Sequence, residues 1–320
     1  MKLPLIIGIP LLLCAAASAQ SITSTFTGGN DGWDVVNASY SGHIVLPTGA
    51  STPAPFDGVE GLPAGSLRVS DLFGETGVRA PSAFVGDRLA WFGGRFSYDI
   101  KIRFTDATPY PAVWLVGATK TLVYNTPSPP LDAWLHVDVP LLETGFRLNG
   151  WQGTAATRGD LMEVLADLRG ILINTEWRTG PDDTNVDNVE LAQPTTGASC
   201  YGAACPGSNG RWPTTWVTGN VASGSTIGIE VTDGVPGSFA LIVVGFGPAN
   251  VPLFGCTAWI NPTSTNFFLG LDGTGRASMT GTLPPASAGP LATLQSVLFD
   301  TAAPNGNGLV LSNAVQMTVP

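Results

Sequence analysis

Hydrophobic and polar positions alternate along many short segments of this chain. The clearest alternation runs through residues 95–104, where every second residue is apolar and those between are polar or charged. Its apolar members are Phe96, Tyr98, Ile100, Ile102 and Phe104. Period two predicts a β-strand with one buried face, because successive side chains of a strand point to opposite sides. Residues 112–116 and 121–124 predict a hairpin that turns near Gly117, and 134–139 predicts a further strand.

One segment has helical periodicity instead. Apolar residues recur at helical spacing through 161–169, Thr157 suits the N-cap position, and Asp160 stands three positions later. This is a capping pattern, and Gly170 is a typical helix stop. We therefore expect one short helix, followed by a return to strands that ends at 186–191.

The first 19 residues have the pattern of an export signal. Lys2 supplies a positive start, Leu3 to Leu13 is an apolar run, and Ala17-Ser18-Ala19 is a small-residue cleavage site. The apolar run is too short to span a bilayer. We expect residues 1–19 to be a signal peptide, and the mature protein to be secreted or held at the cell surface without spanning a membrane.

The chain divides at residues 193–198, a short linker that begins Gln-Pro-Thr-Thr-Gly. Beyond this linker charged residues become rare and Gly, Thr, Ser and Pro dominate. A length of 320 residues is typical of two domains. We expect a first domain at 20–192 and a smaller β-sandwich domain at 199–320, with strands at 226–231 and 240–245 among others.

Composition and charge exclude several classes of protein. The 40 glycines and 26 prolines follow no short period, which excludes collagen and fits short strands joined by tight turns. The formal net charge is −10, with only 14 Lys and Arg residues against 24 Asp and Glu. Nucleic-acid binding needs clustered basic residues, so we expect no nucleic-acid partner.

A set of short motifs occurs in order between residues 24 and 191. They are Gly32-Trp33, Ala80-Pro81, Phe84-Val85-Gly86-Asp87, Gly93-Gly94, Trp134 with Val137, Ala155 to Asp160, and Val186-Asp187-Asn188-Val189. In this order the motifs resemble the laminin B domain, also called laminin IV type A. Trp91-Phe92 departs from the family, which more often has Ser or Tyr before its glycine pair.

The laminin B resemblance implies a jelly-roll β-sandwich with one short helix, similar in architecture to carbohydrate-binding modules. It also implies an extracellular and non-catalytic role. The resemblance supplies no binding residue, because the partner of the family is not defined at that level.

The second domain resembles a C-terminal domain of exported proteins from bacteria such as planctomycetes and myxobacteria. The matching motifs are Cys205-Pro206-Gly207-Ser208, Phe254-Gly255-Cys256, Gln295-Ser296-Val297, Ala303 to Gly308 and Ser312-Asn313-Ala314. The resemblance implies a disulfide between Cys205 and Cys256, which leaves Cys200 as the spare thiol; a Cys200–Cys205 pair is the alternative. It implies no activity.

Oxygen-bearing side chains gather in residues 182–188 (Asp-Asp-Thr-Asn-Val-Asp-Asn) and again at Asn30 and Asp31. Alternating oxygen ligands are typical of calcium loops. Asn30 and Asp31 open the first domain and Asp187 closes it, so these three could hold a structural calcium ion. The alternative is a polar turn whose side chains cap backbone groups.

Four tryptophans stand beside glycines or polar residues: Trp91, Trp114, Trp151 and Trp177. An exposed indole can stack against a sugar ring, whereas most tryptophans in a β-sandwich belong to the core. Trp91 and Trp151 are the candidates for a ligand-binding face.

Catalytic chemistry has only scattered candidates. Two opposed carboxylates, as glycosidases need, could come from Asp99, Asp138, Glu143 and Glu176, but Asp99 and Asp138 occupy the polar side of their strands. A Ser-His-Asp triad could use only His43 or His136. We expect no enzyme, but an exported binding protein that contacts polysaccharide, the cell envelope or the extracellular matrix. The alternative is a structural or adhesive surface protein that binds other proteins.

Overall fold

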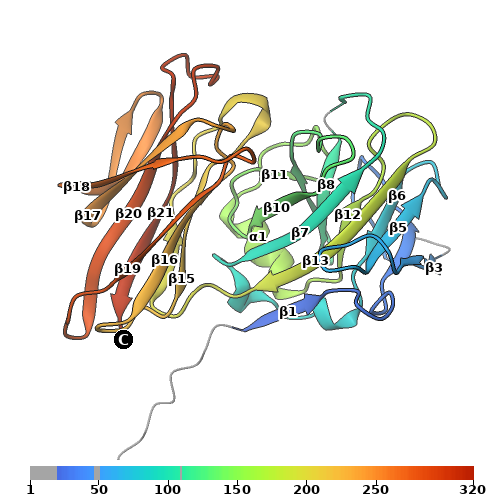
Figure 1. The fold of residues 1–320 in the computed structure, drawn as a ribbon, viewed down its shortest axis with the longest axis horizontal. Coiled ribbons are helices and arrows are strands. Elements are labelled where there is room, and N and C mark those ends of the chain that lie inside the picture. Colours follow the sequence, from blue (N-terminus) through green and yellow to red (C-terminus); the bar gives the residue numbers. More distant parts are fainter. Residues whose placement is uncertain (1–19, 47–50, 109) are drawn as a thin grey trace, which may run out of the picture.

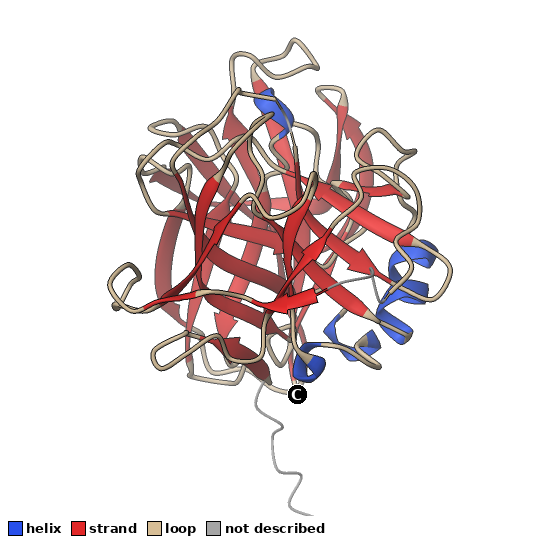
Figure 2. Ribbon diagram, turned by 90° about the vertical axis from the view of Figure 1, so that its right-hand side faces the viewer, coloured by secondary structure: helices blue, strands red, loops and turns tan. Residues whose placement is uncertain are grey.

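The computed structural model describes residues 20–46, 51–108 and 110–320; the predicted signal peptide lies outside these residues. Strands form nearly all of the regular structure (Figure 2). The chain builds two β-bodies that lie side by side, the first from β1 to β13 and the second from β14 to β21 (Figure 1). In the described part of the chain, no helix has the length and apolar character to cross a membrane.

The N-terminal sandwich consists of two antiparallel sheets. One has the strand order β10-β7-β13-β5-β4, with β1 also pairing with β13, and the other has the order β11-β9-β8-β12-β6-β2-β3. The strands are β1 (Ser21–Ser24), β2 (Asp34–Asn37), β3 (Ser51–Pro53), β4 (Phe56–Asp57), β5 (Ser66–Ser70), β6 (Thr76–Arg79), β7 (Arg95–Ile102), β8 (Pro111–Val116), β9 (Thr121–Asn125), β10 (Leu135–Pro140), β11 (Phe146–Leu148), β12 (Gly170–Asn174) and β13 (Asp183–Ala192).

The C-terminal sandwich is smaller. A sheet of order β14-β21-β20-β17-β18 faces a sheet of order β15-β16-β19. The strands are β14 (Ala198–Tyr201), β15 (Thr214–Gly219), β16 (Thr226–Thr232), β17 (Phe239–Leu253), β18 (Cys256–Gly270), β19 (Ala277–Thr282), β20 (Gly289–Phe299) and β21 (Leu309–Val319). Apolar side chains of both sheets form its core. The prediction of an all-β fold with a larger and a smaller sandwich is confirmed.

Strand β7 shows how the alternation becomes a core. Phe96, Tyr98, Ile100 and Ile102 are fully buried between the two sheets. Phe104 departs from the prediction, because it lies beyond the end of the strand and is 39% exposed. The predicted hairpin is also present: β8 and β9 pair antiparallel on either side of Gly117.

Helix α1 (Arg158–Ala166) begins as its sequence predicts. Thr157 and Asp160 form a reciprocal capping box, in which each side chain satisfies a backbone N–H that the helix leaves unpaired. Its end differs, because Gly170 starts β12 instead of stopping the helix. The space that a Cβ on Gly170 would occupy is filled by Leu46. A larger residue at this position would have to displace the end of the Leu46 side chain.

Candidate functional site

The outer side of the six-stranded sheet carries a continuous set of polar side chains, which we call the polar face. It follows from the alternation, because the residues between the buried apolar ones must point outward. Its members are Ser66, Arg68, Arg95, Ser97, Asp99, Lys101, Arg103, His136, Asp138, Asp183, Asn185, Asp187, Asn188 and Glu190.

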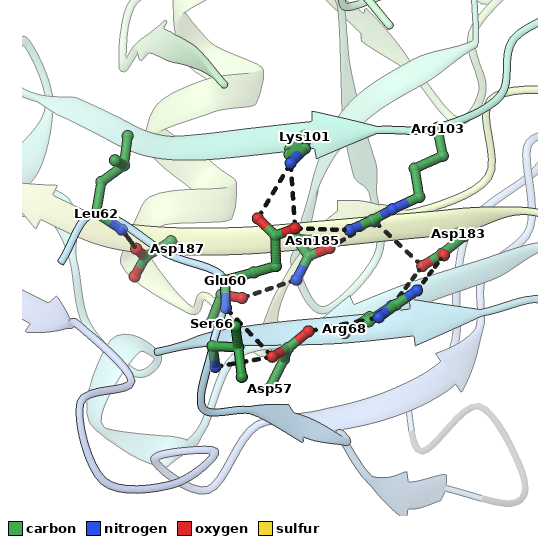
Figure 3. Close-up of polar contacts among 11 residues, drawn as sticks. Asp57, Glu60, Leu62, Ser66, Arg68, Lys101, Arg103, Asp183, Asn185 and Asp187 are labelled. Atoms are coloured by element: carbon green, nitrogen blue, oxygen red, sulfur yellow. Dashed lines mark hydrogen bonds and ion pairs between the residues drawn. The ribbon is translucent and has the colours of Figure 1, made fainter. Parts of the chain in front are cut away.

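Ion pairs fix the charged side chains in the middle of this face (Figure 3). Arg68 donates to both carboxylate oxygens of Asp183, at 3.0 and 2.7 Å. Arg103 donates to Asn185 Oδ1 at 2.7 Å and contacts Asp183 at 3.3 Å. Charged side chains that pair in this way lose much of their rotational freedom.

The segment between β4 and β5 lies across the polar face and is bonded to it. Glu60 accepts hydrogen bonds from Lys101 at 3.0 Å and from Arg103 at 3.4 Å (Figure 3). The backbone N–H of Leu62 donates to Asp187 Oδ2 at 2.7 Å. These bonds cover part of the face, and burial raises the pKa of Asp187.

A bulge in β13 brings Asp187 and Asn188 into contact with Leu62, in the segment between β4 and β5. The register of β13 against β7 shifts between Asp187 and Glu190, and Asn188 has a positive φ of 47°. Asn tolerates this left-handed conformation better than most residues. Asn188 Nδ2 consequently reaches both Leu62 O and Asp99 Oδ2, each at 2.8 Å.

The C-terminal sandwich covers the other end of the polar face. Arg276 Nη1, from the segment before β19, lies 2.6 Å from Asp138 Oδ2. Arg95 adds a second link through Glu230 of β16, at 3.4 Å. The polar side of a strand would by itself leave Asp138 open to water, yet its side chain is only 2% exposed. The second body excludes water from it.

His136 lies between two carboxylates at this junction. Its Nδ1 is 2.6 Å from Asp99 Oδ1 and its Nε2 is 3.6 Å from Asp138 Oδ1. Burial by itself lowers the pKa of His136, but the carboxylates of Asp138 and Asp99 outweigh burial and raise it to about 9. The imidazole is therefore protonated at neutral pH and completes the ion-pair cluster.

The raised pKa of His136 predicts a pH dependence of stability. An unfolded histidine has a pKa near ~6.5, so the folded state holds this proton more tightly. The contribution of His136 to stability is complete below about pH 6.5 and is lost as the pH rises through about 9. We expect the difference in unfolding free energy between the wild type and His136→Gln to shrink over this window in urea titrations. If the difference stays constant from about pH 6 to about pH 10, the raised pKa of His136 is wrong.

The predicted ligand-binding tryptophans are not exposed platforms. Trp91 is 8% exposed and belongs to the main core, with the Arg88 guanidinium 4.9 Å from its ring centroid. Trp114 and Trp177 are fully buried. Trp151 is half-buried against a small apolar cluster outside the seven-stranded sheet. The expectation of an open stacking face at Trp91 is therefore wrong, because the sheets enclose its ring.

The predicted calcium residues cap backbone groups. Asn30 Oδ1 accepts from Gly32 N at 3.2 Å, and Asp31 Oδ2 accepts from Phe26 N at 3.3 Å. Asp187 is occupied by Leu62 N and by its own neighbour, Asn188 N. Within the described residues no three His, Cys, Asp or Glu side chains are grouped as metal ligands. These contacts are those of the alternative interpretation, the polar turn.

The remaining catalytic candidates do not gather around His136. Glu176 follows β12 in the opposite sheet and accepts from Thr76 N at 2.7 Å. Burial raises its pKa to about 7. His43 Nδ1 lies 3.0 Å from Thr121 Oγ1, also on that sheet. Glu143 is half-buried after β10.

The cysteines pair as the C-terminal resemblance implied. Cys205 and Cys256 form a disulfide that joins the segment after β14 to the start of β18. The alternative Cys200–Cys205 pair is excluded, because Cys200 is a free thiol. Burial raises the pKa of Cys200 to about 12, which favours the protonated thiol at neutral pH.

The solved structures similar to this chain have low sequence identity. The L4b domain of human laminin alpha-2 is 16% identical, with a TM-score of 0.44, and the match covers 55% of this chain and 98% of that domain. A β-1,2-glucanase from Parabacteroides distasonis is 13% identical, with a TM-score of 0.30, and the match covers 95% of this chain and 37% of the glucanase.

Sequence comparisons place a family match on part of the chain. A basement membrane proteoglycan of Caenorhabditis elegans is 31% identical over 117 residues, which are 35% of this chain. The chain spans only 3% of the length of that proteoglycan. The predicted likeness of the second domain to exported bacterial proteins stays a prediction. Residues 78–203, from β6 to just beyond β14, match the family model described as Laminin B (Domain IV).

Proposed function

We propose that this chain is a non-catalytic binding protein that acts outside the cell and contacts a polysaccharide of the envelope or matrix. The Laminin B match at residues 78–203 supports an extracellular binding or structural role. The similarity to a basement membrane proteoglycan supports the same setting. Polysaccharide as the partner rests on the polar face.

The observation that carries the proposal is the fixed arrangement of donors and acceptors on that face. Sugar hydroxyls bind to guanidinium, ammonium, amide and carboxylate groups by hydrogen bonds. Here Arg68, Lys101 and Arg103 are already held by Asp183, Asn185 and Glu60. A ligand would therefore lose little affinity to side-chain ordering. The charges also compensate one another, which favours a neutral polymer.

The non-catalytic part of the proposal rests on how the acidic residues are used. A glycosidase needs one carboxyl group free to donate a proton and another free to attack or to activate water. Asp99 and Asp138 instead hold His136 between them, and Asp138 also binds Arg276. Asp138 thereby joins the two sandwiches, and Asp99 helps to hold His136.

A second candidate function is adhesion to other proteins. Three phenylalanines of the C-terminal sandwich, Phe239, Phe268 and Phe299, are 48%, 60% and 43% exposed. Their rings form one cluster, with centroids 5.2 and 6.3 Å apart. Exposed apolar patches often mark protein-binding sites. This cluster favours the structural or adhesive alternative.

Binding of the purified chain to an array of neutral polysaccharides tests the proposal. We expect Arg68→Gln to weaken binding about tenfold or more, since it removes a charged hydrogen-bonding group. Arg169→Gln is the matched control, because both arginines pair with an aspartate and are similarly exposed, at 47% and 53%. Absence of binding to any polysaccharide rejects the proposal and leaves the adhesive function. Equal effects of the two substitutions reject the polar face as the site.

A further inference from the structure

A cavity of about 570 Å³ lies between the two sandwiches, next to β10. Its N-terminal wall comes from residues 126–137 and its C-terminal wall from Arg211, Asp233, Pro236 and the turn before β19. Small-ligand sites commonly have volumes of about 300–1,000 Å³ and often lie at domain interfaces. The volume and the place of this cavity, which we call the junction cavity, are those of a ligand site.

The apolar part of its wall is an indole among proline rings. Trp134 is half-buried and lines the cavity together with Pro127, Pro130 and Pro236. A half-buried indole keeps part of its flat ring exposed, and that part can pack against the C–H groups of a sugar ring. This is the surface that Trp91 does not offer.

The polar part of the wall combines opposite charges with hydroxyl groups. Arg211 contributes a guanidinium, which is held by a hydrogen bond from Nη1 to Gly234 O at 3.2 Å. Asp233 contributes a carboxyl group, and Thr126 contributes a hydroxyl. Asp233 Oδ2 and Thr126 Oγ1 are both enclosed without a hydrogen-bond partner in the protein. Enclosed polar atoms usually have partners, so these two oxygens are natural points of contact for a polar ligand.

The polar groups of the wall can both donate and accept hydrogen bonds. Arg211 and Asp233 carry opposite formal charges, and His136 is paired with Asp99 and Asp138. Burial, followed by the charge of Asp138, raises the pKa of Asp233 to about 7, so near neutral pH its carboxyl group can donate as well as accept. This set offers both donors and acceptors to the hydroxyl groups of a neutral sugar.

The junction cavity is continuous with the polar face, because His136 belongs to both. A polymer that lies along the sheet would reach the cavity at β10, the edge strand of that sheet. We propose that the junction cavity binds a terminal neutral pyranose of the polysaccharide, with Trp134 as the stacking surface and Asp233, Arg211 and Thr126 as hydrogen-bonding groups. This inference rests on the proposed function and adds a site to it.

The test uses the full chain and two ligands: the polysaccharide that binds most tightly on the array, and a panel of neutral pyranose monosaccharides observed by saturation-transfer NMR. We expect Trp134→Ala to weaken polysaccharide binding about tenfold and to abolish the monosaccharide signal. Thr126→Val keeps the side-chain shape, removes only the hydroxyl, and is expected to weaken binding severalfold. Trp259→Ala is the control, because Trp259 is also half-buried but does not line the cavity.

The outcomes separate this inference from the proposed function. If Arg68→Gln weakens polysaccharide binding but Trp134→Ala and Thr126→Val do not, the polar face is the site and the junction cavity is not. If no polysaccharide binds but monosaccharides bind in a way that depends on Trp134, the cavity site stands without the polymer. If neither ligand binds the wild type, both are overturned. Unchanged circular dichroism of the variants shows that they fold.

Discussion

Asp138→Asn is expected to lower the free energy of unfolding by about 3–5 kcal/mol. Removing one partner of a buried ion pair costs this much; here Arg276 loses the carboxylate it pairs with, while His136 keeps Asp99 and Arg95 keeps Glu190 and Glu230. Asp138 is 2% exposed and lies 2.6 Å from Arg276, 3.6 Å from His136 Nε2 and 4.0 Å from Arg95. The substitution keeps the side-chain shape and leaves all three cations. Urea titration at pH 7 measures the loss.

The control for this prediction is Asp167→Asn. Asp167 also pairs with an arginine, Arg169, at 2.9 Å, but both side chains are more than half exposed. Exposed ion pairs contribute about 0–1 kcal/mol, so the control should change stability little. Equal losses for the two variants would mean that the C-terminal sandwich does not bury Asp138. The double variant Asp138→Asn/Arg276→Gln should recover part of the loss, because it removes the facing charge as well.

Replacing both Cys205 and Cys256 with alanine is expected to cost roughly 3–4 kcal/mol of unfolding free energy. The two cysteines are 51 residues apart in sequence. On the chain-entropy model, a crosslink that closes a loop of this length restricts the unfolded chain by about that amount. The loss should be confined to the C-terminal sandwich, where both cysteines are part of the core. Thermal melting measures the size of this loss, and hydrogen exchange shows which of the two sandwiches is affected.

Cys200→Ala is the matched control for the disulfide. Cys200 packs against the same core but forms no crosslink. We expect this variant to melt close to the wild type and, because it keeps the Cys205–Cys256 disulfide, to lose stability in reductant as the wild type does. The wild type should lose stability in reductant by the same amount as the double variant loses by substitution. A reductant-sensitive double variant would show that Cys200 takes part in a different bond.

The sequence by itself determined the secondary-structure elements of this protein. The alternation at residues 95–102 specifies a strand with one buried and one polar side, because strand geometry leaves no other arrangement. The capping box of Thr157 and Asp160 specifies where the helix begins, because its bonds are made within a single turn. These are local interactions, and nearby residues are enough to predict them.

The exposure of the tryptophans was decided by packing. Neighbouring glycines and polar residues made Trp91 a candidate for an open ligand-binding face, yet its ring is buried. Burial depends on which sheet or loop lies over a side chain, and that is set by residues far away in sequence. Trp134 shows the reverse: the sequence marks it only as part of a family motif, and the approach of the second sandwich makes it part of the wall of a cavity.

The domain junction likewise depends on tertiary structure. The position of Asp138 on the polar side of β10 follows from the alternation, but its burial does not, because Arg276 is more than a hundred residues further along the chain. Strand periodicity describes which side of a sheet a residue faces and says nothing about what later covers that side. The sequence therefore determined the strands, the helix start and the polar face. The docking of the two sandwiches decided which of those polar groups are buried and where a cavity lies, since these depend on contacts between distant residues.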